Sequence, residues 1–222
     1  MPNLRKQDAT VVIHGDSRYN DGQYDTVSVH SVIVTDGPLT QSYYVPGGPT
    51  ISKEGLALIR KHGLEFRPYT EEELFQDVGD EVDEARQNDP LAVEAGFART
   101  LLRSTLVNAP LQLIKVLPNG SHVYNLSYDY KIFPENENFQ MEIRLPLSGI
   151  AMPSGEVTLT VLAPQKVTIN RAITKGTDEQ GNELEEQLTD LQQTYRQVVT
   201  FQYRKDPIFI INYSHNEGLF QG

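Results

Sequence analysis

The chain has 222 residues, a formal net charge of −11 and no cysteine. The acidic balance argues against a dedicated nucleic-acid-binding protein, which needs a basic stripe to release counterions, and against adsorption to an anionic membrane surface. The absence of cysteine excludes disulfides, thiolate metal sites and a cysteine nucleophile. The length fits one large domain or a small module joined to a second domain.

The start of the chain and its apolar stretches bear on location. Residues 1–8 contain no apolar run of the kind found in signal peptides. No apolar stretch approaches the ~20 residues that a membrane-spanning helix needs. We therefore expect a protein without a signal peptide or transmembrane segment, located in the cytoplasm or in a virion.

β-Branched residues mark the first strands. Residues 10–13 and 24–34 are predicted strands, and in the second of them Val27, Val29 and Ile33 share one face, which Ser31 interrupts. Between them, residues 16–22 are rich in Asp, Ser, Asn and Gly and predict a turn. A third short strand is expected near residues 42–45, before a Pro-Gly-Gly-Pro break.

Three helices are expected next. Ser52 is a predicted N-cap, and Gly63 follows the last turn of that helix. Thr70 and Glu73 form a capping box, after which an apolar stripe recurs at helical spacing through Leu74, Val78, Val82 and Ala85. A third helix begins at Asp89-Pro90, an N-cap followed by proline at the first helical position, and runs towards Leu106.

The hydrophobic period changes to two near residue 107. In residues 122–132, Tyr124, Leu126, Tyr128, Tyr130 and Ile132 share one face, and residues 139–147 alternate in the same way. Such strands are half-buried and antiparallel. Further strands are expected at residues 111–117, 156–162, 166–173, 197–203 and 207–213, and a short amphipathic helix carrying Leu184, Leu188, Leu191 and Tyr195 is expected between two of them.

These patterns predict an α+β protein that is mainly an antiparallel β-sandwich of about seven C-terminal strands. We expect an N-terminal part, residues 1–106, with strands and about three helices, and a sandwich over residues 107–222 with an excursion near 178–195. In the alternative, the strands before residue 50 complete the C-terminal sheet and residues 51–106 are a helical insertion.

One short motif suggests an enzyme. Gly15-Asp16-Ser17 follows the apolar run Val11–Ile13 and resembles the nucleophile block of the lipase and esterase family with a Gly-Asp-Ser motif. That resemblance implies a serine activated by a histidine and oriented by a carboxylate, roles that His215 and Asp206 could fill. The chain departs from the family after Ser17, where no helix pattern follows, so an Asp/Ser turn between strands is the competing interpretation.

The sequence predicts neither a metal site nor a cofactor. Residues 16–22 resemble a calcium loop only superficially, because an EF-hand needs Gly at the sixth position, where Asp21 stands. Among the five histidines, only His14 and His30 could meet across adjacent strands. A surface or core histidine is the expected role for both.

The tyrosine row on the strand over residues 122–132 has two interpretations. Tyr124, Tyr128 and Tyr130 could stack on sugar rings or form a protein interface. The same row could pack inward with its hydroxyls at the rim of the sandwich. We expect the core role, and keep the interface as an alternative.

Three classes of function follow. We expect a non-enzymatic structural or interaction subunit of a larger assembly, such as a phage virion or tail-like particle, whose partners are copies of itself or neighbouring subunits, with no direct contact to nucleic acid or membrane. The first alternative is a serine hydrolase that uses Ser17 and His215. The second alternative is a carbohydrate- or peptide-binding β-sandwich module.

Overall fold

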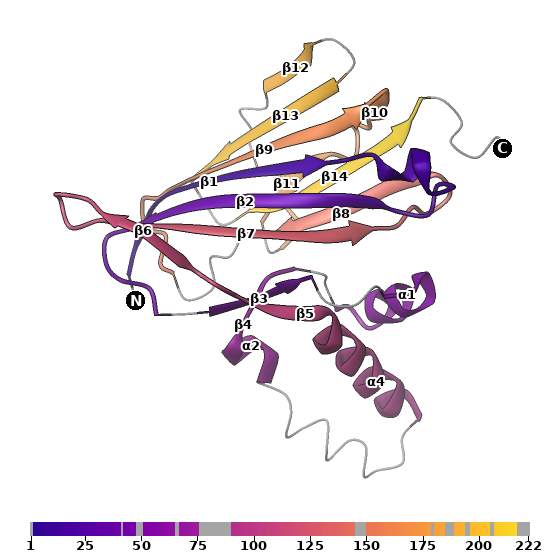
Figure 1. Ribbon diagram of the computed structural model, residues 1–222, viewed down its shortest axis with the longest axis horizontal. Helices are drawn as coiled ribbons and strands as arrows, with labels where there is room; N and C mark the ends of the chain where they lie inside the picture. The colour runs from indigo at the N-terminus through magenta and orange to yellow at the C-terminus, as the bar shows by residue number, and fades with distance from the viewer. Residues whose placement is uncertain are drawn as a thin grey trace.

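A computed structural model describes residues 2–40, 42–47, 51–64, 67–75, 90–144, 150–178, 180–184, 189–193, 196–204 and 207–216. Two β-sheets stack on each other, and a smaller sheet with helices lies against one side of them (Figure 1). The α+β class with a mainly antiparallel β-sandwich is confirmed.

The larger sheet has seven strands in the order β12, β13, β9, β1, β2, β7 and β6. Neighbouring strands are antiparallel except β1 and β9, which run parallel. Their bounds are β1 (Leu4–Ile13), β2 (Asp25–Thr35), β6 (Gln112–Val116), β7 (His122–Ile132), β9 (Glu156–Gln165), β12 (Thr189–Gln193) and β13 (Arg196–Tyr203).

The second sheet is built around β14 (Ile208–His215), which pairs with β8 (Asn138–Arg144) along one side and with β10 (Val167–Ile169) and β11 (Lys175–Thr177) along the other. The alternation predicted for residues 139–147 is confirmed as far as Arg144, because Phe139, Met141 and Ile143 are buried. These side chains and those of β14 pack with the inward face of the larger sheet in one hydrophobic core. This core is what makes the two sheets a sandwich.

The third sheet joins β3 (Ser42–Pro46) to β4 (Tyr69–Thr70) on one side and to β5 (Leu106–Pro110) on the other. Three helices accompany it, namely α1 (Lys53–Lys61), α2 (Glu71–Phe75) and α4 (Pro90–Thr105). Its Tyr43 and Val45 pack on Leu126 of β7. The small sheet therefore packs against the inward face of the larger sheet, next to β7.

The predicted helix caps form. The Ser52 side chain accepts a hydrogen bond from the Gly55 backbone N–H, at 3.1 Å. At α2 the Thr70 N–H donates to Glu73 over 2.7 Å, and the Glu73 N–H donates back to the Thr70 hydroxyl over 3.3 Å. Both caps satisfy N–H groups that would otherwise lack a partner. The expected apolar stripe beyond Phe75, including Val78, Val82 and Ala85, lies outside the described residues.

Strands from both halves of the sequence share the larger sheet. β1 and β2 lie between β9 and β7, as Figure 1 shows. Strands that precede and follow residue 107 therefore belong to one hydrogen-bonded sheet. Residues 51–106 contribute strand β4 and the start of β5 as well as helices.

Two segments differ from the sequence-based expectation. Residues Thr189–Gln193, expected within a short helix, form strand β12, because they find a hydrogen-bonding partner in β13. Leu188 and Tyr195 lie outside the described residues. The strand expected over residues 166–173 ends at Ile169, since the Asn170 carbonyl accepts turn hydrogen bonds from Ile173 and Thr174.

Ser31 has a structural partner. It is fully buried on β2, and its hydroxyl accepts a hydrogen bond of 2.9 Å from the Gln7 amide on β1. The polar residue that interrupts the apolar face of this strand is thus matched by a second buried polar side chain on the neighbouring strand, as buried hydroxyls require.

Candidate functional site

Ser17 lies in the turn between β1 and β2. Gly15 precedes the short 3-10 helix Asp16–Tyr19 and has a φ of 72°, a left-handed conformation that favours glycine. A Cβ atom at Gly15 would lie 2.8 Å from the Cβ of Pro164. The chain therefore needs glycine here to turn beside Pro164, and this turn carries Ser17 inward, where it is fully buried.

The structure brings Ser17 and His215 together. The Ser17 hydroxyl lies 3.1 Å from His215 Nε2, although 198 residues separate the two. His215 is the last residue of β14, and its side chain is only 3 % exposed. Asp206, the carboxylate expected from the sequence, lies outside the described residues, and Asp25 at the start of β2 is the carboxylate in contact with the pair.

Asp25 is fully buried and well supplied with donors. Its Oδ1 accepts from the Ser17 backbone N–H at 2.8 Å, and its Oδ2 accepts from the Tyr213 hydroxyl at 2.5 Å. Burial alone would raise the pKa of Asp25, but hydrogen bonds from His215, Ser17 and Tyr213 hold this pKa below its ordinary value. Asp25 is therefore an ionised, acceptor-only group. Burial and the charge of Asp25 raise the pKa of Tyr213 well above its ordinary value.

The hydrogen bonds around His215 differ from those of a serine hydrolase. Asp25 Oδ2 lies 3.5 Å from Nε2, the same nitrogen that faces Ser17. In a catalytic triad the carboxylate holds the opposite nitrogen, so that the nitrogen facing the serine is free to take its proton. Here the opposite nitrogen, Nδ1, accepts from Arg18 Nε at 3.4 Å.

This arrangement fixes the tautomer of the neutral ring. Because Nδ1 accepts from Arg18, the ring proton sits on Nε2, which faces both Ser17 and Asp25. A protonated Nε2 cannot act as a general base towards Ser17. The burial of Ser17 also keeps a substrate from its hydroxyl. The cluster Ser17, Arg18, Asp25, Tyr213 and His215, hereafter the Asp25 cluster, is arranged to join β14 to the β1–β2 turn.

The tyrosine row faces the core. Tyr124 and Tyr130 are buried, and Tyr128 is partly buried against the same cores. The Tyr124 hydroxyl accepts from the Leu39 backbone N–H at 2.8 Å. These three residues therefore do not form the exposed aromatic surface that the interface alternative requires.

His14 and His30, considered above as possible metal ligands, do not face each other across the sheet. His14 contacts the Ser28 hydroxyl at 2.8 Å, and His30 contacts the Ser127 hydroxyl at 3.1 Å. His30 pairs across the sheet with Thr10, not with His14. Among the described residues no group of three or more His, Asp or Glu side chains is placed to hold a metal ion. No helix of the described segments is long and apolar enough to cross a membrane.

An apolar sheet edge lies on the opposite side of the larger sheet from β12. β6 is the last strand, and within the described residues its outer edge has no strand partner. Leu113, Ile114 and Val116 are 50 %, 54 % and 53 % exposed. The pairing register with β7 shifts between Leu113 and Lys115, so Ile114 has no Cα partner there. Sequence reasoning predicted this strand but not that it would end a sheet, because an edge is a property of the pairing order.

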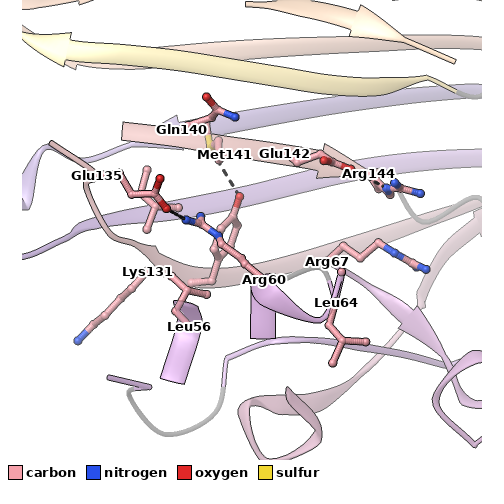
Figure 2. Close-up of a pocket in the computed structure, with 13 residues that line it drawn as sticks. Leu56, Arg60, Leu64, Arg67, Lys131, Glu135, Gln140, Met141, Glu142 and Arg144 are labelled. Atoms are coloured by element: carbon pink, nitrogen blue, oxygen red, sulfur yellow. Dashed lines mark hydrogen bonds and ion pairs between the residues drawn. The ribbon is translucent and has the colours of Figure 1, made fainter. Parts of the chain in front are cut away.

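A cavity of about 440 Å³ opens between α1 and the facing parts of β7 and β8. Leu56 and Arg60 of α1 line one side, and Met141 of β8 lines the other (Figure 2). Arg60 forms an ion pair with Glu135 at 2.6 Å, drawn as a dashed line in Figure 2. No sequence motif marked this cavity, because its lining residues come from segments far apart in the chain.

No protein-family model matches the chain, and no curated protein matches it. The chain has weak structural similarity to two solved structures of an M1 zinc metallopeptidase from Deinococcus radiodurans. The first, bound to a Tyr-Ser-Ala substrate, has a TM-score of 0.40 at 10 % identity, and the second 0.35 at 9 %. Each match covers 96 % of this chain and 42 % of the metallopeptidase chain, so this chain spans less than half of their length.

Proposed function

We propose that this protein is a non-enzymatic interaction subunit that assembles with a second copy of itself through the outer edge of β6. The observation that carries the proposal is the exposed apolar edge formed by Leu113, Ile114 and Val116. The backbone N–H and C=O groups of an unpaired edge strand are a template for another strand. Exposed apolar side chains on the same strand add the hydrophobic contact that such pairing buries.

A second copy fits this edge by symmetry. Most homo-oligomers use a twofold axis, which brings the same patch of both copies together. An antiparallel pair centred on Ile114 places Leu113 opposite Lys115 of the second copy, and Gln112 opposite Val116. No like charges then face each other across the axis, since Lys115 is the one charged residue of β6. The resulting sheet is continuous through both copies.

The net charge of −11 opposes this association at long range. Added salt screens repulsion between exposed charges separated by more than about 10 Å at 0.1 M. Association through an apolar edge should therefore strengthen as salt is added. An interface held by ion pairs would weaken as salt is added. The salt dependence of association therefore distinguishes an apolar interface from an ionic one.

Light scattering across a hundredfold concentration range tests the proposal. The mass of the wild-type protein should rise from 25.0 kDa towards twice that value. Ile114→Lys should remain a monomer, because it places two lysines opposite each other on the axis. Val32→Lys is the matched control, since Val32 is 42 % exposed on β2 in the middle of the same sheet, and it should associate like the wild type.

Charge complementation sharpens the test. Ile114→Glu should also be monomeric alone, and an equimolar mixture of Ile114→Lys and Ile114→Glu should restore the dimer. A wild-type protein that stays at 25.0 kDa at every concentration, or an Ile114→Lys variant that dimerises normally, would overturn the proposal.

The proposal keeps the broader part of the sequence-based expectation, assembly with protein partners. No feature of the described residues points to a phage particle in particular. The serine hydrolase gains no support, since His215 Nε2 lies against Asp25 and Ser17 is buried. The tyrosine row gives no support to a carbohydrate- or peptide-binding face, because Tyr124 and Tyr130 are buried.

A further inference from the structure

The cavity beneath α1 combines features of a ligand site and is separate from both the Asp25 cluster and the β6 edge. Its volume of about 440 Å³ falls within the range of roughly 300–1,000 Å³ that small-molecule sites occupy. It lies where β8 ends one sheet and β7 runs in the other, so its walls come from both layers of the sandwich and from α1.

The cavity has an apolar lining that includes buried side chains. Leu56 on α1, Tyr130 and Ile132 on β7, and Met141 on β8 are all buried, and the Tyr130 hydroxyl donates to the Met141 sulfur at 3.6 Å. A thioether sulfur is a weak acceptor, so the Met141 end of the cavity is essentially apolar. An aliphatic or aromatic group placed against these residues would leave water for an apolar surface.

Cationic side chains surround this lining. Arg60, Arg67 and Arg144 line the cavity from three separate segments, and Glu135 and Glu142 are the two carboxylates there. Arg144 forms an ion pair with Glu142 at 2.8 Å. Lys131 also lines it, but its ammonium group stacks over the Tyr24 ring at 3.9 Å. Arginines outnumber carboxylates here in a chain whose acidic residues outnumber its basic ones by 30 to 19. The local charge therefore favours an anion.

Arg60 has donors available for such an anion. Its Nη1 donates to Glu135, and within the described part of the chain the Arg60 side chain makes no other hydrogen bond or ion pair. A guanidinium carries several further N–H groups, which suit the two oxygens of a carboxylate. The Glu135 side chain is 71 % exposed, so its ion pair with Arg60 is weak and a second carboxylate can share the guanidinium.

Arg67 is held differently. It donates to Glu73 at 3.0 Å and stacks over the Tyr69 ring at 4.1 Å. We assign it the role of adding positive potential from a fixed position. Arg60 is less constrained and lies beside the apolar lining in Figure 2, so it is the arginine best placed to contact an anion there.

We propose that this cavity binds a small amphipathic carboxylate, with its apolar body against Leu56, Ile132 and Met141 and its carboxylate on Arg60. Octanoate is the probe, and octanamide is its uncharged counterpart of the same length. The full chain has three methionines, so methyl-labelled methionine gives three NMR signals. Met141 reports on the cavity, while Met152, which does not line the cavity, serves as the internal reference. Met141→Leu assigns the signal by removing it.

Octanoate should shift the Met141 signal in a saturable way and leave the Met152 signal unchanged. Octanamide should bind at least about tenfold more weakly, the factor expected for losing a charge-assisted hydrogen bond. Arg60→Gln should weaken octanoate binding by a similar factor. Arg5→Gln, a change at an exposed arginine on β1, is the matched control and should bind like the wild type.

Three results would overturn the inference. The first is an unchanged Met141 signal up to the solubility limit of octanoate. The second is equal binding of octanoate and octanamide, which would mean that the cavity takes any apolar chain. The third is an unchanged affinity in Arg60→Gln, provided that its circular dichroism spectrum and its Met152 signal match those of the wild type.

Discussion

The Tyr213 hydroxyl donates a hydrogen bond of 2.5 Å to the buried carboxylate of Asp25, across 188 residues of sequence. This bond links the second sheet to the start of β2 in the first. Both residues are fully buried. Hydrogen bonds to a charged group are among the stronger ones in proteins, and they cost more to break when the charge stays buried.

Tyr213→Phe should lower the free energy of unfolding by about 2 kcal/mol, because the carboxylate loses one donor while the ring packing is kept. Urea unfolding followed by circular dichroism measures the change. Tyr19→Phe is the matched control, since Tyr19 is 90 % exposed and should show no loss. A Tyr213→Phe variant as stable as this control would contradict the assignment of Asp25 as the ionised centre of the cluster.

The stability of the fold should depend on the ionisation of Asp25 in acid. Its pKa is lower in the folded than in the unfolded protein, so it stabilises the fold fully above the unfolded value of about 3.9. This contribution is lost as the pH falls through the folded pKa. We expect the free energy of unfolding of Asp25→Asn to be lower than that of the wild type by about 3 kcal/mol at neutral pH.

The difference between wild type and Asp25→Asn should narrow as the pH is lowered below about 4. Urea titrations at a series of pH values measure it. Asp36→Asn is the comparison. The pKa of Asp36 is also lowered, because its carboxylate accepts hydrogen bonds from Asn3, but its side chain is partly exposed. If the difference in the free energy of unfolding between wild type and Asp25→Asn stays constant as the pH is lowered, Asp25 is not ionised in the folded protein.

Ser17 should not react with a fluorophosphonate probe. Its hydroxyl is buried, and the nitrogen of His215 that faces it also lies 3.5 Å from Asp25 Oδ2. Labelling of the native protein is measured by in-gel fluorescence, with a reference serine hydrolase in the same tube to show that the probe is active. Labelling that appears in the wild type and disappears in Ser17→Ala would restore the hydrolase hypothesis.

Two glycines should respond oppositely to alanine. A Cβ at Gly176 would lie 2.1 Å from the hydroxyl of Tyr203, which is buried, so Gly176→Ala should cost about 2 kcal/mol or more. Gly96 lies within α4 with open space around it. Gly96→Ala should stabilise the protein by up to about 1 kcal/mol through helix propensity. Thermal unfolding compares both, and a neutral Gly176→Ala would contradict the close packing of β11 on Tyr203.

Local patterns of the sequence were sufficient for most elements. Alternation identified β7 and β8 because every second side chain of a pleated strand faces the core. The caps at Ser52 and Thr70 were predictable because the bonds that form them span three residues. The helix expected around Leu191 did not form in residues Thr189–Gln193, because pairing with β13 outweighed the helical spacing of the leucines.

The Asp25 cluster shows which residues of a site a short sequence motif predicts and which it does not. The Gly-Asp-Ser resemblance named Ser17 and His215, whose side chains lie 3.1 Å apart. It did not reveal Asp25 or Arg18, whose positions set the ring tautomer and with it the chemistry. The signal available for Asp25 was an acidic residue at the start of a strand, which is common at strand ends and carries no specific meaning.

The sequence by itself determined most of the secondary structure, the sandwich class and the acidic charge, because each depends on composition or on contacts between near neighbours in the chain. Only the tertiary structure decided that β1 lies between β2 and β9, that β6 ends the sheet, and that Arg60 meets Met141 at one cavity. These relationships join residues far apart in sequence. Strand order and side-chain convergence arise from packing the whole chain into one core, which no local pattern encodes.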